Sequence, residues 1–208
     1  MVVRAQRDAT FREIINTSQL SVCDTVGLLA VARLRGMPIK ERVTGVDLIE
    51  NLCAAPNGSI PIYFLGGAEG IAEKAAATLR SQYSGVQIAG TQNGFFQESD
   101  APRVCGDITA SGAKILCVGL GSPRQELWLH RHLAATGCSV GIGVGGAFDV
   151  ISGTLKRAPA MWQRFGFEWL YRLVTEPWRW RRQLALPYFV LLVMADTLVS
   201  LTRQKRNA

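Results

Sequence analysis

The sequence predicts an α/β protein in which a Rossmann-like parallel sheet is flanked by helices, followed by a helical C-terminal appendage. Three observations predict it: apolar runs that end in glycine-rich turns, helix-like segments between those runs, and a change to aromatic and arginine-rich composition after Met161. Continuous apolar runs are typical of strands that are covered on both faces. We therefore divide the chain into an α/β core, residues 1–159, and an appendage, residues 160–208.

The core begins with helical segments. Residues 10–20 mix charged and apolar side chains as a short surface helix does. Residues 25–34 form an apolar helical stretch that Asp24 could cap.

Strands and helices then alternate. Apolar runs at 60–65, 86–89, 114–118 and 138–142 predict strands, and segments 69–82 and 124–135 predict helices. Glycine-rich turns follow three of these strands, at 66–67, 119–123 and 143–146. Ligands of open parallel sheets bind beyond the carboxyl ends of the strands, where these turns lie.

The net charge of +7 suggests a polyanionic partner, such as nucleic acid, an anionic membrane surface or a phosphorylated substrate. Most of the excess lies in the C-terminal quarter, next to the apolar run 184–201. This position favours a membrane surface and argues against nucleic acid. Five cysteines without a C-x-x-C pair indicate free thiols, and the N-terminus has no signal-peptide pattern, so we expect a cytoplasmic protein.

The apolar run 184–201 has about eighteen residues, the lower limit for a membrane-spanning helix. It contains Pro187 and also Asp196, whose charge is costly inside a bilayer. We favour a helix lying in the membrane interface, with a transmembrane anchor or a plain core helix as alternatives.

Two glycine-rich segments could bind phosphate. Residues 141–146 fit the G-x-G-x-x-G pattern with Glu168 at 22 residues beyond, as in a dinucleotide enzyme. That alternative is weak because Gly153 and a KRAP turn interrupt the chain where a βαβ unit should continue. In the other segment, Gly119 and Gly121 precede Pro123 at a helix start, an arrangement that favours an anion but also occurs in ordinary strand-to-helix turns.

Six motifs in one order make the sequence resemble the WecG/TagA/CpsF glycosyltransferase family over about residues 12–182. They are ERVTGVDL at 41–48, NGFF at 93–96, VGLGSPRQE at 118–126, GVGGAFD at 143–149, KRAP at 156–159, and EWLYRL with EP at 168–177. The resemblance implies inverting transfer of a sugar from a UDP-sugar donor to a polyprenyl-diphosphate-linked sugar acceptor, for cell-surface polysaccharide, at the inner face of the cytoplasmic membrane. It implies no cofactor and no metal.

The resemblance also assigns catalytic residues. Asp24 matches the position of the catalytic base, and a carboxylate can accept the proton of the attacking hydroxyl. A helix cap is the alternative role. Arg42 matches a functional arginine suited to a diphosphate, and its alternative is an ion pair with Glu41 or Asp47.

Further residues match substrate-binding positions: Asn93, Gly119, Gly121, Gln125 and Asp149. The amide of Gln125 and the carboxylate of Asp149 could form hydrogen bonds with the uracil or the ribose, or could serve as structural caps.

Three appendage arginines, Arg172, Arg179 and Arg182, match residues thought to contact the diphosphate. On one helix from about residue 165 they would share a face. Contact with anionic lipid is the alternative role. Because His130 and His132 point to opposite sides of a helix and no cysteine stands at ligand spacing, a zinc site is not expected, and cationic side chains must neutralise the departing UDP.

Family members usually begin with a further strand and a Thr- or Asn-bearing loop, upstream of where this sequence starts. The sequence therefore admits a second function, a catalytically impaired relative that binds membrane or a partner protein. The oligomeric state is left open, a homo-oligomer included.

Overall fold

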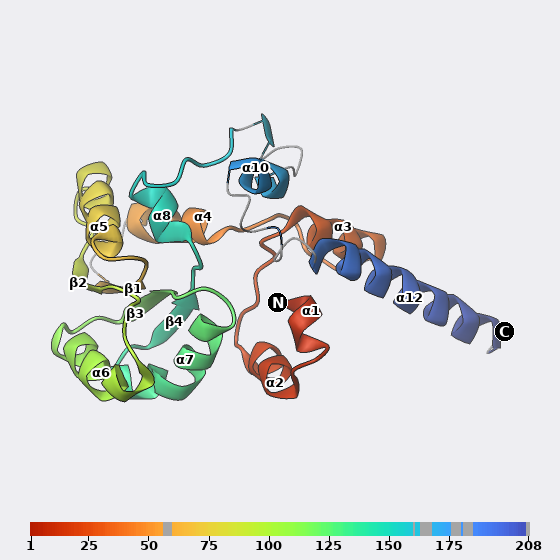
Figure 1. The fold of residues 1–208 in the computed structure, drawn as a ribbon, viewed down its shortest axis with the longest axis horizontal. Coiled ribbons are helices and arrows are strands. Elements are labelled where there is room, and N and C mark those ends of the chain that lie inside the picture. The colour runs from red at the N-terminus through yellow and green to blue at the C-terminus, as the bar shows by residue number, and fades with distance from the viewer. Residues whose placement is uncertain (56–59, 160, 163–167, 176–179, 181–184, 207–208) are drawn as a thin grey trace. The chain divides into compact units, whose positions relative to one another are not determined.

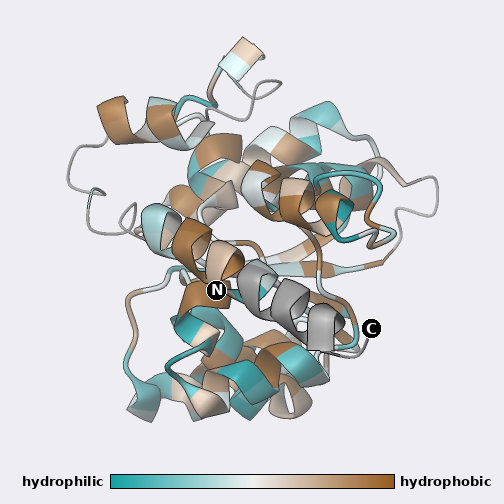
Figure 2. Cartoon of the chain, turned by 90° about the vertical axis from the view of Figure 1, so that its right-hand side faces the viewer, coloured by the Kyte–Doolittle hydropathy of each residue, from teal (hydrophilic) through white to brown (hydrophobic). Residues whose placement is uncertain are grey.

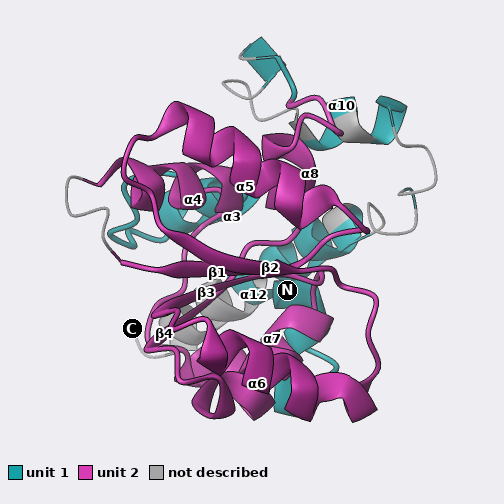
Figure 3. Ribbon diagram, turned by 90° about the vertical axis from the view of Figure 1, so that its left-hand side faces the viewer, with its two compact units in different colours: residues 1–12, 25–42, 158–208 teal, residues 13–24, 43–157 magenta. Residues whose placement is uncertain are grey.

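The computed structural model describes residues 1–55, 60–159, 161–162, 168–175, 180 and 185–206. The chain forms two compact units, coloured separately in Figure 3. Unit 2 comprises residues 13–24 and 43–157, and unit 1 comprises residues 1–12, 25–42 and 158–208. The segment predicted as an appendage thus shares a unit with two N-terminal segments.

Unit 2 is built on a parallel sheet with the strand order β2-β1-β3-β4. The strands are β1 (Ile62–Gly66), β2 (Ile88–Gln92), β3 (Ile115–Gly119) and β4 (Val140–Gly143). In the register of the two central strands Ile62 pairs with Ile115 and Gly66 with Gly119. Their carboxyl ends therefore finish side by side.

Alternate residues of the central strands enter two separate cores, because successive side chains of a strand point to opposite faces. Phe64 and Cys117 pack with helices α4 (Gly45–Ala54), α5 (Ile71–Gln82) and α8 (Ala147–Ile151). Leu65 and Val118 pack with α6 (Ala101–Ala110) and α7 (Arg124–His132) on the other face (Figure 1). This double coverage explains the continuous apolar strands.

The crossovers place the topological switch point at the centre of the sheet. Helix α5 carries the chain from β1 to β2 on one face, whereas α6 and α7 carry it from β2 to β3 and from β3 to β4 on the other. Right-handed crossovers in opposite directions require opposite faces. The crevice outside the carboxyl ends of β1 and β3 is therefore the expected ligand site.

The regular secondary structure of unit 1 is helical in the residues that the structure describes. It holds α1 (Val2–Ala5), α3 (Val26–Leu34), α10 (Glu168–Thr175) and α12 (Ala185–Arg206), and α2 (Ala9–Thr17) runs across the unit boundary.

Helix α12 packs on α1, and two of its side chains meet arginines from N-terminal segments. Arg7 lies 4.7 Å from the ring centre of Tyr188, and Arg35 forms an ion pair with Asp196 at 2.5 Å. The acid that interrupts the apolar run therefore has a cationic partner.

One surface of α12 leaves large apolar side chains exposed. Val190, Leu191 and Met194 are exposed, and Figure 2 shows hydrophobic residues along the first part of this helix. Among the residues that the structure describes, no helix has the length and hydropathy needed to cross a bilayer.

The predicted fold class is confirmed, as are four strands and the helices that follow β1 and β3. Four helices, α1, α4, α6 and α8, did not emerge from the sequence pattern. Helix α6 follows a short 3-10 turn, Glu98–Asp100, and α4 begins inside the ERVTGVDL motif, where Thr44 and Asp47 form a capping box. All five cysteines are free, as expected.

Candidate active site

The candidate site lies at the carboxyl edge of the sheet in unit 2, where three glycine turns meet. The N–H of Gly67 donates to the carbonyl of Gly119 at 3.1 Å, which ties the turn after β1 to the end of β3. The N–H of Gly94, after β2, donates to the carbonyl of Gly67 at 2.8 Å. These main-chain bonds build a continuous rim at the switch point.

Gly119 and Gly121 are required for different reasons. A Cβ on Gly119 would lie 2.8 Å from the Phe148 ring and 2.9 Å from the carbonyl oxygen of Gly145, so this glycine allows close packing between β3 and the next turn. Gly121 has a φ of +75° and open space around the place of a Cβ. It supplies the left-handed turn that starts α7.

Asn93 braces the loop after β2. Its side-chain oxygen accepts the N–H of Phe95 at 3.0 Å, in an Asx turn. Phe95 itself is 75% exposed. The loop thus presents an aromatic ring to solvent at the rim.

Gln125 is 5% exposed and directs its amide into unit 2. Its Oε1 accepts the N–H of Gly145 at 3.0 Å, and its Nε2 donates to Glu126 Oε1 at 2.8 Å. The second carboxylate oxygen of Glu126 is buried and has no partner among the described residues.

Asp149 lies in the first turn of α8 and is partly buried. A Cβ on Gly146 would lie 3.5 Å from its Oδ2, so the carboxylate lies back over the start of the helix. This start is at the same edge of the sheet as the glycine turns.

Asp24 is exposed and immediately precedes Thr25, the N-cap of α3. The Thr25 hydroxyl oxygen accepts the N–H of Leu28, so the cap role considered for Asp24 is taken by its neighbour. In unit 2, the N–H of Val43 donates to the carbonyl of Cys23 at 2.9 Å. This bond brings the segment before Asp24 beside the ERVTGVDL motif.

Two of the four predicted arginines are described, and both fall in unit 1. Arg42 is partly buried in a segment without regular secondary structure, and Arg172 lies on α10. Arg179 and Arg182 lie outside the described residues, and so do several parts of the single helix expected from about residue 165.

Three of the sequence motifs converge at the start of α4. Asp47 accepts hydrogen bonds from the N–H and hydroxyl of Thr44 and pairs with Arg157 of the KRAP motif at 2.5 Å. A Cβ on Gly45 would lie 2.6 Å from the carbonyl oxygen of Val144, in the GVGGAFD motif. Burial raises the pKa of Asp47, but the bonds from Thr44 and Arg157 outweigh it and hold the pKa below its ordinary value.

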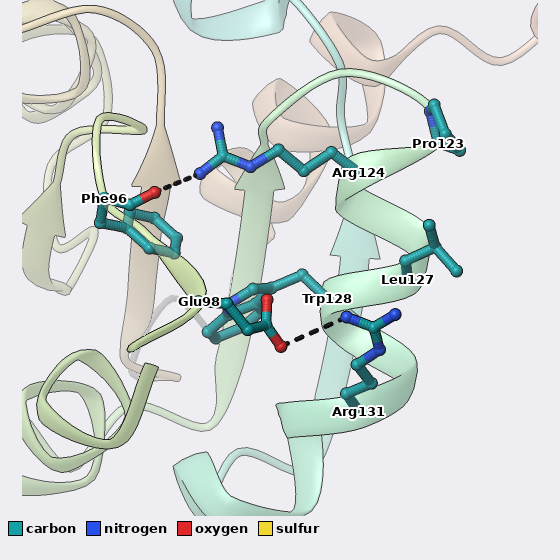
Figure 4. Close-up of a pocket in the computed structure, with 7 residues that line it drawn as sticks. All are labelled: Phe96, Glu98, Pro123, Arg124, Leu127, Trp128 and Arg131. Carbon is teal, nitrogen blue, oxygen red and sulfur yellow. Dashed lines mark hydrogen bonds and ion pairs between the residues drawn. The ribbon is translucent and has the colours of Figure 1, made fainter. Parts of the chain in front are cut away.

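A pocket of about 420 Å³ lies beside α7 and was not expected from the sequence. Figure 4 shows its lining, Phe96, Glu98, Pro123, Arg124, Leu127, Trp128 and Arg131.

Both arginines of this pocket are engaged with the loop after β2. Arg124 donates to the carbonyl of Phe96 at 2.7 Å and lies 5.0 Å from the centre of its ring, and Arg131 pairs with Glu98 at 3.3 Å. A hydrogen bond from His132, reinforced by Arg131, lowers the pKa of Glu98. The pocket side chains therefore brace the loop that carries Asn93.

The dinucleotide alternative finds no support in the described residues. The turn after β4 leads into α8, which has five residues, and no strand follows α8 in the part of the chain that the structure describes. A dinucleotide fingerprint should open a βαβ unit.

Comparison with known proteins identifies the family of this chain. The model of the glycosyl transferase WecG/TagA/CpsF family matches residues 1–203. An N-acetylglucosaminyldiphosphoundecaprenol N-acetyl-beta-D-mannosaminyltransferase of Bacillus spizizenii (strain ATCC 23059 / NRRL B-14472 / W23) is 33% identical over 91% of this chain and 74% of its own length. A protein of the same name from Bacillus subtilis (strain 168) is 32% identical over 92% of this chain and 75% of its own.

The parallel α/β fold with its glycine-lined carboxyl edge defines a ligand-binding α/β protein, and the family match specifies a glycosyltransferase. The chain belongs to the WecG/TagA/CpsF family of glycosyltransferases.

Proposed function

We propose that this protein transfers a sugar, with inversion and without a metal, from a UDP-sugar to a polyprenyl-diphosphate-linked sugar. Support comes from the family membership and from the names of the two relatives, which specify an N-acetylglucosaminyl-diphosphoundecaprenol acceptor and an N-acetyl-β-D-mannosaminyl group. N-acetylmannosamine is therefore the first donor sugar to test. The product would enter cell-surface polysaccharide.

Asp24 is the proposed base. The observation that carries this role is that Thr25, not Asp24, caps α3, while Asp24 is an exposed carboxylate in the segment bonded to the ERVTGVDL motif. The carboxylate accepts the proton of the acceptor hydroxyl as that oxygen attacks the anomeric carbon from the face opposite UDP. The sugar–phosphate bond breaks, and its electron pair leaves with UDP.

The donor is proposed to bind at the carboxyl edge, near Asn93, Asp149 and the main chain of Gly119 and Gly121. Negative charge builds on the departing diphosphate, and preorganised cations stabilise such charge most when they are already in place. Arg42, Arg172, Arg179 and Arg182 are the proposed cations.

The appendage is proposed to hold the enzyme at the inner face of the cytoplasmic membrane, where a lipid-linked acceptor lies. Exposed apolar side chains on α12 and the arginine-rich composition of residues 157–206 support this.

The test is UDP release from a panel of UDP-sugars with a polyprenyl-diphosphate-N-acetylglucosamine acceptor, with and without EDTA. We expect turnover with one donor, unchanged in EDTA, and a loss of about 10²- to 10⁴-fold in Asp24→Asn with donor affinity retained. Full loss in EDTA restored by Mg²⁺ would overturn the metal-free mechanism. Vesicle binding without turnover for any UDP-sugar would instead favour an impaired relative that acts as a binding module.

A further inference from the structure

The turn Gly143–Gly146, which joins β4 to α8, is packed tightly on two sides. The N–H of Val144 donates to the carbonyl of Val118 at 2.9 Å, which fixes the turn to β3. A Cβ on Gly45 would lie 2.6 Å from the carbonyl of Val144, so the turn also contacts the start of α4. A small shift of this turn would therefore also displace β3 or the start of α4.

From α7, Gln125 reaches the same turn with a side-chain hydrogen bond. Its Oε1 accepts the N–H of Gly145 at 3.0 Å, and its Nε2 donates to Glu126 at 2.8 Å. The Gly145 N–H can only donate, so it fixes which end of the amide is the oxygen. The amide is thus oriented from both ends and is 5% exposed.

The carboxylate of Glu126 makes this arrangement sensitive to charge. Its second oxygen is buried and has no partner among the described residues, so the Gln125 N–H is a main compensation for burying the group. A carboxylate in place of the Gln125 amide would face Glu126 at hydrogen-bonding distance and repel it.

We infer that Gln125 is a positioning residue, which holds the β4–α8 turn and through it Asp149, rather than a residue that reads the donor. Asp149 follows Gly145 by four residues, in the first turn of α8. We call the hydrogen bond between Gln125 and Gly145 the latch. Since a misplacement of a substrate-positioning group by about 1 Å can cost about 10²-fold in rate, the latch would set the geometry of the donor pocket. This inference rests on the donor role proposed for Asp149.

Exchanging the two neighbouring side chains tests the latch. Gln125→Glu keeps an acceptor for Gly145 but sets two carboxylates together, and we expect kcat/KM for the UDP-sugar to fall by about 10²-fold. In the double variant Gln125→Glu/Glu126→Gln, both hydrogen bonds can re-form. Residue 125 again accepts the N–H of Gly145, and the amide of residue 126 now donates to the carboxylate of residue 125. We expect the double variant to recover to within about threefold of the wild type, as coupled neighbours do. Glu126→Gln alone, which keeps an acceptor for Gln125, is the matched control and should stay near the wild type.

Two outcomes would overturn the latch. If Gln125 donates its N–H to the UDP-sugar, the double variant has no donor at this position and stays as impaired as Gln125→Glu. If the residue only stabilises the fold, Gln125→Glu lowers the unfolding temperature but leaves kcat and KM unchanged below it.

Hydrogen exchange at residues 143–149 supplies a readout that is independent of activity. We expect exchange to be faster in Gln125→Glu and restored in the double variant. Wild-type protein that fails to turn over any UDP-sugar would contradict the proposed function. The exchange pattern would still show whether the hydrogen bond between Gln125 and Gly145 holds the β4–α8 turn in place. Unchanged exchange in Gln125→Glu would refute the latch whatever the activity.

Discussion

The guanidinium of Arg157 bonds to the carboxylate of Asp47 across 110 residues of sequence, with Nη2 and Oδ1 2.5 Å apart. The same carboxylate accepts from the N–H and hydroxyl of Thr44, so it both caps α4 and anchors the segment that leaves α8. In this family member, the Asp of one motif and the Arg of another thus form one structural contact.

The first prediction concerns this contact. Asp47→Asn should lower the free energy of unfolding at pH 7 by about 1 kcal/mol, a modest figure because both side chains are partly exposed. The folded pKa of Asp47 lies below the ordinary value of 3.8, so this stabilisation is complete above pH 3.8 and is lost as the pH falls through the folded pKa. Urea unfolding at several pH values should show the two proteins converging in acid.

A matched control is Asp107→Asn, which removes an exposed ion pair with Arg103 on α6. It should cost no more than about 0.5 kcal/mol. An equal loss in both variants would mean that the Asp47–Arg157 pair contributes no more than a surface ion pair.

The second prediction separates capping from catalysis at neighbouring residues. Thr25→Ala should lower stability by about 1 kcal/mol, because the N–H of Leu28 loses its side-chain acceptor. Asp24→Ala should cost less, because the bond from the N–H of Leu28 to Thr25 stays in place. If calorimetry showed a larger loss of stability at Asp24 than at Thr25, Asp24 would be the cap of α3. The argument that Asp24 is the catalytic base would then fail.

The third prediction concerns close packing at the rim. Gly119→Ala should destabilise unit 2 by about 1–3 kcal/mol, because the added methyl group meets the Phe148 ring and the carbonyl of Gly145. Gly106→Ala, inside α6 with open space around it, should stabilise by about 0.5–1 kcal/mol. Denaturant titration of both variants checks the sign, and a neutral Gly119→Ala would contradict the packing described for this turn.

The fourth prediction tests the apolar surface of α12. Leu191→Glu combined with Met194→Glu should greatly reduce sedimentation with anionic vesicles, because two exposed apolar side chains are replaced by negative charges. Ser81→Glu on α5, an exposed site in unit 2, controls for added charge. Vesicle binding that survives in the double variant would exclude this surface as the attachment site.

The fifth prediction separates two roles of the appendage arginines. If Arg172, Arg179 and Arg182 stabilise departing UDP, single Ala substitutions should lower turnover with a soluble acceptor analogue, where membrane attachment no longer matters. Loss of vesicle binding with normal soluble turnover would assign them to lipid instead.

The sequence by itself determined the α/β class and the family. Apolar runs in 60–65 and 114–118 predicted strands buried on both faces, and the glycine turns after them marked the carboxyl edge. These features depend on local residue type and spacing, which a single chain displays directly. The six motifs were visible for the same reason.

The tertiary structure decided which partner each polar group meets. Gln125 and Asp149 looked equivalent in sequence, yet the amide of Gln125 is bonded to Gly145 and Glu126 inside unit 2. Arg157 likewise reaches Asp47 only because β4 and α8 bring distant segments together. A hydrogen bond depends on distances of a few tenths of an ångström between residues far apart in the chain, and residue order carries no such distance.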